Sequence, residues 1–401
     1  MLIATGTRVI AISPEEHRQL VTIYQAFERE VDCTVENTEA MRIIAGNINA
    51  TYCLLHRESG RMFIMQRMNT IFDLAAIDNN LQWLEAAQAR SREALPDHWQ
   101  TVGYLNVAGQ GTHKLFHDEA GQAWRIMRFV PGAIKIFNSF NEVPAEMRAG
   151  VARSLGEAIA IFGRMLEALP AEAWQQPLPH FHDARYHLDY LKAVLQGETV
   201  TLSLSRDASR RVTLRQDIME RYAQRIEALL EKVAAREYLV PVLDSLGQIV
   251  AHGDTKINNF VFRPGEDGTM QCICLIDLDT VQLGNTLDDL GDALRSAGNP
   301  AGEEPADIDT VHIDAEIVRQ IVEGYLAKIN DFYGEEREQQ FRRHAIDSGK
   351  VFLYVQCARF FADALVGNEY FKPKPGHHED INLYRAEVQM RALEAMEHVK
   401  I

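Results

Sequence analysis

The residues best suited to chemistry lie in one short run, in which a histidine, an aspartate, a lysine and an asparagine follow the pattern H-x-D-x-K-x-x-N. The aspartate is Asp254, the lysine is Lys256 and the asparagine is Asn259; a further aspartate, Asp277, follows eighteen residues after Asn259. This spacing suits phosphoryl transfer from a nucleotide, because Asp254 can accept the proton of an attacking hydroxyl while Lys256 steadies the moving charge. Asn259 and Asp277 can supply oxygen ligands to a Mg²⁺ ion that holds the phosphate oxygens.

The segment between Asn259 and Asp277 supplies a scaffold for this site. Two apolar stretches flank the turn-forming sequence Pro264–Gly268, so we predict a β-hairpin that carries Asn259 and Asp277 at the ends of paired strands. Asp279, two residues further on, either binds a second metal ion or orders the loop. Each of these residues alone could be an ordinary loop residue or a helix cap, but their joint spacing would rarely arise by chance.

The overall composition restricts the possible partners. The chain has 401 residues, enough for two or three lobes, and its 46% apolar and 24% charged residues are ordinary for a globular protein. A formal net charge of -16 argues against nucleic-acid or anionic-membrane partners, because both attract basic surfaces. The five scattered cysteines indicate a reducing compartment and no disulfide framework. Without a signal-peptide pattern or an apolar run of membrane-spanning length, a cytoplasmic protein is predicted.

The catalytic run also carries a family resemblance. The sequences Asp254–Asn259 and Asp277–Thr280 resemble the catalytic core of the protein-kinase-like fold, in the variant that aminoglycoside phosphotransferases, choline kinase and homoserine kinase use. Within that group they are most similar to the N-acetylhexosamine 1-kinases. The resemblance implies an α+β, bilobal fold, with an antiparallel β-sheet in the N-lobe and a mostly helical C-lobe. It also implies ATP and Mg²⁺ as cofactors.

Local patterns divide the chain in the same way. Residues 1–37 are predicted to be an N-terminal helical extension, because a Ser-Pro-Glu-Glu start signal precedes an amphipathic segment. Residues 38–131 then form the nucleotide-binding N-lobe and residues 132–401 the catalytic and substrate-binding C-lobe, with a Pro-Gly pair at the boundary. Further helices are predicted at residues 78–92, 143–169, 217–235, 314–332 and 347–365.

The first strands of the N-lobe are expected to cover the nucleotide. A hairpin is predicted around a glycine-containing turn whose backbone N–H groups can approach phosphates, and Asn47 and Asn49 lie at its tip. The third strand follows at residues 61–68, where kinases place a phosphate-binding lysine. This strand contains no lysine, so Arg67 is the candidate for the phosphate contact, and Gln66 is the alternative on the opposite face.

Three further residues have roles that this fold implies. Glu85, on the predicted helix at residues 78–92, is the expected acidic partner of Arg67, with a solvent-exposed glutamate as the alternative. Phe129 belongs to the strand and hinge between the lobes, where the adenine of a nucleotide is bound through backbone hydrogen bonds. Asp289 is expected to cap a helix and to hydrogen-bond back to the catalytic loop, a structural role outside the chemistry.

The acceptor site is assigned through the resemblance. The sequence Phe-His-Asp at 181–183 is similar to a substrate-facing motif of the sugar-kinase relatives, which makes His182 a candidate contact; a helix start capped by Asp183 is the alternative. Arg359 and Tyr370 lie in a pattern similar to the C-terminal substrate segment of N-acetylhexosamine 1-kinases. A guanidinium and a hydroxyl-bearing ring suit an acetamido sugar, unless Arg359 pairs with Asp363 one turn on.

The most specific function implied is ATP- and Mg²⁺-dependent phosphorylation of the anomeric hydroxyl of an N-acetylhexosamine, GlcNAc or GalNAc. One alternative keeps the reaction and changes the acceptor to another small alcohol, such as an aminoglycoside, choline or homoserine. The other is a catalytically silent kinase fold that serves as a binding module, against which the intact motif argues. In each case the expected partner is a small molecule, with no nucleic acid and no membrane.

Overall fold

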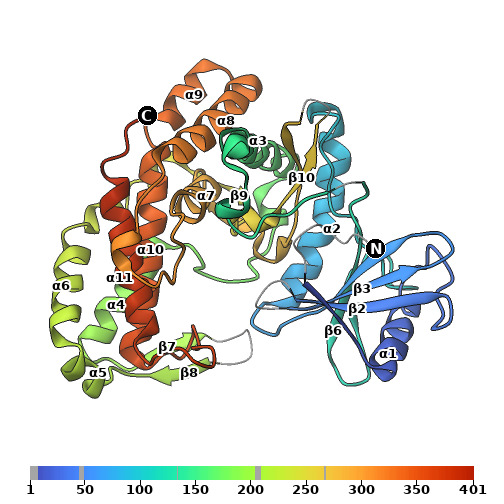
Figure 1. Cartoon of the computed structure of the whole chain (residues 1–401), viewed down its shortest axis with the longest axis horizontal. Coiled ribbons are helices and arrows are strands. Elements are labelled where there is room, and N and C mark those ends of the chain that lie inside the picture. Colours follow the sequence, from blue (N-terminus) through green and yellow to red (C-terminus); the bar gives the residue numbers. More distant parts are fainter. Residues whose placement is uncertain (1–7, 45–48, 133, 204–208, 266–267) are drawn as a thin grey trace.

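The computed structural model describes residues 8–44, 49–132, 134–203, 209–265 and 268–401. Figure 1 shows two lobes, a sheet with flanking helices from the N-terminal part of the chain and a larger, mostly helical lobe from the rest. This arrangement confirms the predicted α+β bilobal fold, with an antiparallel sheet in the N-lobe and mainly helices in the C-lobe.

The N-lobe is built on a six-stranded sheet with the strand order β1-β2-β3-β4-β6-β5, in which all neighbours are antiparallel. Side chains alternate between its two faces. On β4, Phe63 and Met65 therefore join one apolar cluster, whereas Ile64 packs against the other. The strands are β1 (Arg8–Ala11), β2 (Thr38–Ile44), β3 (Ala50–His56), β4 (Met62–Arg67), β5 (Phe116–His117) and β6 (Ala123–Arg128).

Two helices cover the two faces of this sheet. Helix α1 (Pro14–Gln25) begins at the predicted Ser-Pro-Glu-Glu signal, which forms a capping box, and its apolar stripe packs on the face that carries Phe63. Helix α2 (Leu74–Ser91) packs on the other face. Residues 1–37 were expected to be only helical, but β1 pairs with β2 and so extends the sheet. The N-terminal segment therefore belongs structurally to the N-lobe.

In the C-lobe, α3 (Arg148–Leu166) and α8 (Ala315–Tyr333) pack face to face through glycines. A Cβ on Gly156 would lie 1.9 Å from the backbone oxygen of Ile321, and one on Gly324 would lie 2.1 Å from that of Arg153. These helices, together with α10 (Ala345–Val366), confirm three of the predicted helical segments. The other C-lobe helices are α4 (Ala184–Leu195), α5 (Gln216–Arg221), α6 (Ala223–Ala234), α7 (Asp288–Gly298), α9 (Glu335–Arg342) and α11 (Ile381–Met396).

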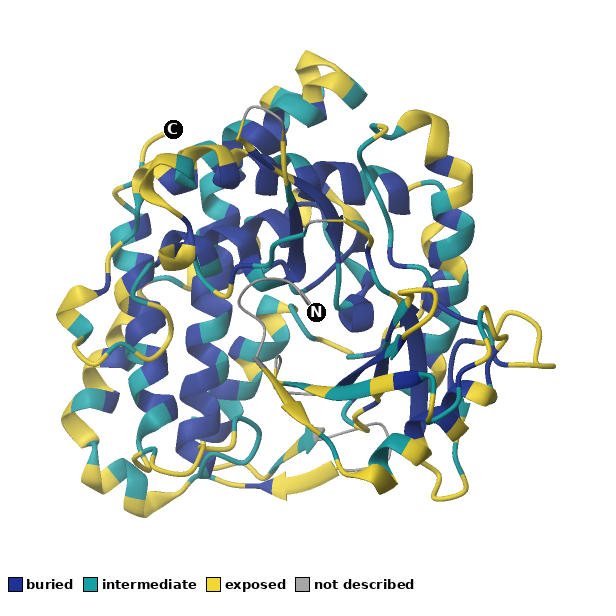
Figure 2. Ribbon diagram, turned by 45° about the vertical axis from the view of Figure 1, so that its right-hand side comes forward, coloured by how far each residue is buried: buried dark blue, intermediate teal, exposed yellow. Residues whose placement is uncertain are grey.

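Helix α10 runs through the centre of the C-lobe, where it packs against α4, α7 and α11 (Figure 1). Figure 2 shows the buried residues, in dark blue, gathered in the interior of this helical lobe. It is apolar on all sides and almost entirely buried, as expected of a central helix. None of the helices within the described ranges is long and apolar enough to cross a membrane. The hydrophobic core of this lobe continues without a break to the strands that carry the catalytic motif.

Three two-stranded antiparallel sheets complete the described part of the C-lobe. Strand β10 (Phe260–Pro264) pairs with β11 (Met270–Leu275), which confirms the predicted hairpin of the catalytic motif. Strand β9 (Gln248–Ala251) pairs with β12 (Gln282–Asn285). The chain enters the site from β9 and leaves it along β12. The third two-stranded sheet, β7 (Val200–Ser203) with β8 (Ser209–Val212), lies away from the motif at the far end of the lobe (Figure 1).

Candidate active site

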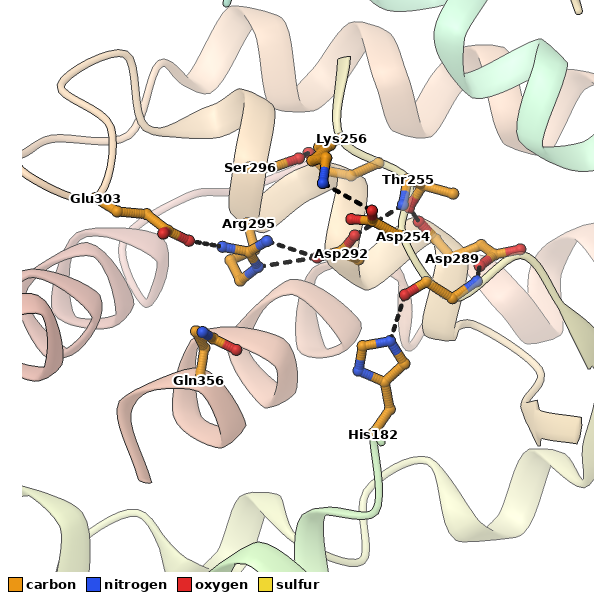
Figure 3. A network of polar contacts seen from close by, with 12 residues as sticks. His182, Asp254, Thr255, Lys256, Asp289, Asp292, Arg295, Ser296, Glu303 and Gln356 are labelled. Atoms are coloured by element: carbon orange, nitrogen blue, oxygen red, sulfur yellow. Dashed lines mark hydrogen bonds and ion pairs between the residues drawn. The ribbon is translucent and has the colours of Figure 1, made fainter. Parts of the chain in front are cut away.

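The predicted catalytic residues Asp254 and Lys256 lie on the loop between β9 and the short 3₁₀ turn Ile257–Asn259 (Figure 3). Gly253 has a φ of +80°, and a Cβ there would lie 2.7 Å from the carbonyl oxygen of Thr280, so this close turn requires glycine. The two carboxylate oxygens of Asp289 each accept a hydrogen bond at 2.8 Å, from the backbone N–H groups of His252 and Gly253. The predicted hydrogen bonds from Asp289 to the catalytic loop are thereby confirmed, and they anchor the loop to α7. The predicted helix cap is wrong, because Asp289 lies inside α7, whose N-cap is Leu287 and makes no side-chain cap hydrogen bond.

Asp254, Lys256 and Asn259 converge in the way their spacing predicts. The Lys256 Nζ lies 2.7 Å from Asp254 Oδ2, and Asn259 Nδ2 donates to the same oxygen at 3.0 Å and to the Asp254 carbonyl oxygen at 2.8 Å. Burial opposes the charge of Lys256, but the carboxylates of Asp254, Asp277 and Asp292 together outweigh this effect, so the pKa of the lysine is raised. Asp254 is thus a fixed, partly exposed carboxylate beside a permanent cation.

Asn259 and Asp277, the two predicted metal ligands, lie close together at one end of the hairpin, because the backbone N–H beside Asp277, that of Ile276, donates to the Asn259 carbonyl oxygen at 2.9 Å. The Asn259 Nδ2 faces Asp254, which leaves its Oδ1 for a cation. Burial, followed by the charges of Asp279 and Asp254, raises the pKa of Asp277 to about 6. An amide oxygen and a carboxylate that forms no ion pair with the described residues fit Mg²⁺, which completes its shell with phosphate oxygens and water.

Asp279 is bound by protein groups instead. Its Oδ1 pairs with the guanidinium of Arg125 on β6, and its Oδ2 accepts a hydrogen bond from Asn49 Nδ2 at 2.7 Å. Of the two roles predicted for Asp279, these contacts favour ordering the loop over binding a second metal. In the described part of the chain, no group of three or more His, Cys, Asp or Glu could hold a metal ion by itself. A metal at Asp277 would therefore depend on the phosphates for further ligands.

The strand expected to carry a phosphate-binding cation has its side chains on two faces. Arg67 is exposed at the end of β4, next in the strand to Gln66. Gln66 lies on the opposite face, as predicted, where its Oε1 accepts hydrogen bonds from Arg125 at 2.8 and 2.6 Å. Because Arg125 in turn contacts Asp279, Gln66 faces the catalytic motif and Arg67 does not. Glu85 pairs with Lys114 Nζ at 2.8 Å, so the expected Arg67–Glu85 pair does not form in the structure.

The remaining nucleotide candidates lie at the tip of the hairpin and at the hinge. Asn47 falls outside the described residues. Asn49 is tied to the catalytic motif through Asp279, and its Oδ1 also accepts a hydrogen bond from the backbone N–H of Asn69 at 2.9 Å. Phe129 follows β6 directly, in the connection between the lobes, and its own N–H is taken by the carbonyl oxygen of Met62 at 3.1 Å. Phe129 thus stands at the predicted hinge.

His182 lies below the catalytic loop (Figure 3). One ring nitrogen, Nε2, contacts the carbonyl oxygen of Gly253 at 2.6 Å, and the ring packs between Phe181 and Phe352. Burial lowers the pKa of His182 to about 4, so the imidazole is neutral near pH 7 and Nε2 carries the hydrogen that it donates. Asp183 caps α4 through the Tyr186 N–H at 2.9 Å, as the alternative interpretation of this motif predicts. The observed contact of His182 is with the loop that carries Asp254.

Arg359 and Tyr370 are brought together at the C-terminal part of α10. The guanidinium of Arg359 lies over the rings of Phe181, Tyr370 and Phe371 at 5.0, 5.9 and 5.3 Å from their centroids. The predicted alternative, a pair with Asp363, does not form in the structure. Asp363 instead accepts hydrogen bonds from the backbone N–H groups of Tyr370 and Phe371 at 2.8 and 2.9 Å. The substrate segment and the motif at 181–183 therefore meet at one place.

Two parts of the site were not anticipated from the sequence. Asp292 accepts a hydrogen bond from the Thr255 N–H at 2.8 Å and pairs with Arg295, which also binds Glu303 at 2.7 Å (Figure 3). The spacing of Asp292, three residues after Asp289 on one helix face, was the available signal. The other part is Arg125, for which the strand pattern gave no signal, because a buried arginine looks like any charged residue in a strand.

Residues 39–314, more than half of the chain, match the phosphotransferase enzyme family. Choline kinase from Cryptosporidium parvum Iowa II is 10% identical with a TM-score of 0.51, and covers 94% of each chain. Plasmodium vivax ethanolamine kinase is 12% identical with a TM-score of 0.47 over 96% of this chain and 95% of that one. Macrolide 2'-phosphotransferase from Brachybacterium faecium is 13% identical with a TM-score of 0.43 over 90% and 99%.

The family match covers the N-lobe strands from β2 onward and the whole catalytic motif, including the loop at Asp254 and the hairpin that ends at Asp277. At these low identities, the likeness to the choline kinase structure supports the fold alone. It agrees with the bilobal arrangement of a small sheet and a helical lobe described above. On the family match, the chain belongs to the phosphotransferase enzyme family.

Proposed function

We propose that this protein is an ATP- and Mg²⁺-dependent kinase that phosphorylates the anomeric hydroxyl of an N-acetylhexosamine, such as GlcNAc or GalNAc. Membership of the phosphotransferase enzyme family supports the reaction type. The observation that favours a sugar acceptor is the environment of Arg359. Its guanidinium lies among three aromatic rings, and among the described residues its hydrogen-bond partner is the neutral Gln356, at 3.0 Å.

Among the residues that the structure describes, no carboxylate forms an ion pair with Arg359, so its charge can select among acceptors. Burial lowers the pKa of Arg359, because the surroundings compensate the positive charge of its guanidinium only in part. A carbonyl oxygen, such as that of an acetamido group, would stabilise it, and the faces of Tyr370 and Phe371 suit the apolar face of a sugar ring. Cationic acceptors such as choline or an aminoglycoside would meet a like charge there.

The chain supplies a base, a cation and a positioning amide for the transfer. The anomeric oxygen attacks the γ-phosphorus of ATP, the bond from that phosphorus to the leaving oxygen of ADP breaks, and the hydroxyl proton passes to the Asp254 carboxylate. Lys256, 2.7 Å from Asp254, neutralises charge on the moving phosphoryl group. Asn259 holds Asp254 in place through its Nδ2. When bound, Mg²⁺ supplies positive charge to the phosphate oxygens, and Asn259 Oδ1 with Asp277 would hold it.

Turnover of Mg·ATP on a small panel tests this proposal. The panel holds N-acetylglucosamine, N-acetylgalactosamine, choline, homoserine and kanamycin, with Asp254→Ala as the control. We expect turnover on an acetamido sugar, with phosphate on the anomeric carbon by NMR, and a loss of about 10²- to 10⁴-fold in the control. Turnover on another alcohol alone would keep the phosphotransferase and reject the sugar. No turnover, with nucleotide still bound, would favour the binding module.

Arg359→Met isolates the contact on which the choice of sugar rests. Methionine keeps an unbranched side chain but removes the charge, so the KM for the sugar should rise by about tenfold or more while the KM for Mg·ATP stays unchanged. Arg153→Met is the matched control, because Arg153 lies on α3 with 47% of its side chain exposed. Equal sugar KM values for Arg359→Met and the wild type would remove Arg359 from the acceptor site.

A further inference from the structure

A buried ion pair joins the two lobes beside the metal site. It links the guanidinium of Arg125, on β6 of the N-lobe, to the carboxylate of Asp279, on the turn that follows Asp277 in the C-lobe. The two side chains are 0% and 2% exposed. Removing two charges from water is unfavourable and often outweighs their attraction, so stability alone is a weak explanation for such a pair. Its position at the junction of the lobes suggests a role in the reaction.

The N-lobe side of this pair is fixed by a neighbouring strand. The Nε and Nη2 groups of Arg125 donate to Gln66 Oε1 at 2.8 and 2.6 Å, and the guanidinium lies 5.7 Å from the centroid of the Tyr104 ring. Gln66 stands on β4, the strand on which a lysine was expected and is lacking. The face of β4 that carries Gln66 is therefore uncharged, and the side-chain amide of Gln66 orients the guanidinium of Arg125 on β6.

The C-lobe side is fixed by the hairpin that covers the nucleotide. Asp279 Oδ2 accepts the hydrogen bond from Asn49, the residue that precedes β3, while Oδ1 pairs with Arg125. Asp279 is thus held from two N-lobe strands at once. It shares one tight turn with Asp277, whose backbone has a left-handed φ of 65°, a conformation that is uncommon for residues other than glycine. A shift of Asp279 would consequently move Asp277.

We propose that Arg125 is a positioning residue for phosphoryl transfer, which acts through Asp279 to fix the N-lobe hairpin over Asp277. The inference rests on the proposed function. Strand β4 lacks the expected cation, and Arg125 on β6 supplies one instead. Arg125 contacts the protein groups Gln66 and Asp279, and through them it determines the position of the nucleotide-binding lobe. Arg67, which the sequence favoured for a direct phosphate contact, lies on the other face of the sheet and has no part in this arrangement.

Affinity for Mg·ADP, measured without any acceptor, is the direct test. Arg125→Gln should weaken it by about tenfold or more and raise the KM for Mg·ATP to match, while the KM for the acceptor stays within about twofold. Arg125→Lys keeps the charge but cannot reach both Gln66 and Asp279. Its affinity for Mg·ADP should therefore lie between those of the wild type and Arg125→Gln. Arg236→Gln is the matched control, because Arg236 is 15% exposed and pairs with Glu397 within the C-lobe; it should lower the melting temperature alone.

A double variant protects the test against misfolding. Arg125→Met with Asp279→Leu replaces the ion pair by apolar side chains, a change that buried pairs often tolerate without loss of stability. It should fold and still bind Mg·ADP about tenfold more weakly or worse. Wild-type affinity in both the double variant and Arg125→Gln would overturn the proposal, even for an active kinase. If the wild type transfers no phosphate but the variants still lose affinity for Mg·ADP, the proposed function is rejected. The role of Arg125 in positioning the nucleotide-binding lobe is then retained.

Discussion

His182→Gln offers the sharpest test of how the catalytic loop is held. Glutamine can still donate a hydrogen bond to the Gly253 carbonyl oxygen, where the imidazole Nε2 now lies at 2.6 Å, but it does not titrate. Burial between Phe181 and Phe352 lowers the pKa of His182 to about 4, whereas an unfolded histidine titrates near pH 6.5. The exchange therefore removes a titration and keeps a hydrogen bond.

The sign and size of the effect follow from linkage. Above about pH 6.5 His182 is neutral in both states and contributes no pH dependence to the free energy of unfolding. As the pH falls from there toward about 4, the unfolded chain binds a proton that the folded chain refuses, so the wild type loses stability. At about pH 5 the loss amounts to about 2 kcal/mol from this residue alone. The neighbouring His187, whose pKa burial lowers to about 3, contributes equally to both proteins and cancels.

Urea unfolding of the wild type and His182→Gln, near neutral pH and at about pH 5, measures this difference. The variant should lose about 2 kcal/mol less than the wild type between the two conditions. His398→Gln, at an exposed histidine near the C-terminus, is the control and should behave as the wild type does. An equal loss in the wild type and His182→Gln would refute a buried, neutral His182 beneath the loop.

Three further substitutions test other parts of the argument. Gly156→Ala places a Cβ 1.9 Å from the Ile321 oxygen and should lower stability by about 1–3 kcal/mol or more in a thermal melt, whereas Gly150→Ala, on the same helix with open space around it, should be neutral or slightly stabilising. Asp277→Asn should reduce kcat by about 100-fold or more and raise the Mg²⁺ concentration required, because a charged ligand is lost; an unchanged Mg²⁺ titration would exclude it from the metal site. Arg67→Ala should leave the KM for Mg·ATP within about twofold, and a tenfold rise would return Arg67 to the nucleotide site.

The catalytic loop was predictable because its contacts are short in sequence. Asp254, Lys256 and Asn259 lie within six positions of one another, so a single turn brings them together wherever the loop is placed. The hairpin from Asn259 to Asp277 is also local, since its turn residues and apolar flanks determine which strands pair. The structural role of Asp289 could be inferred because a helix start that follows the motif has few other places to dock.

The nucleotide side was less predictable because it depends on pairing between distant strands. Gln66 and Arg125 are 59 positions apart, and Arg125 and Asp279 are 154 apart, so no local pattern reports that they meet. On β4 the difference between Gln66 and Arg67 is one residue, which reverses the face on which a side chain lies. The sequence favoured the charged Arg67 as the nucleotide contact, whereas the strand register places the neutral Gln66 on the face toward the catalytic motif. Only the pairing of β4 with β6 decides between them.

The acceptor side shows how a turn can leave a side chain available for a ligand. Asp363 stands one helical turn after Arg359, the usual spacing for an ion pair on a helix surface. Helix α10 ends at Val366, however, and Gly367 and Asn368 reverse the chain with φ values of +96° and +61°. The reversed segment directs its free N–H groups at Asp363, which accepts three hydrogen bonds, one of them from Asn382 at 2.9 Å. A carboxylate satisfied in this way no longer needs Arg359, and the guanidinium stays among the rings, where we propose that its charge faces the acceptor.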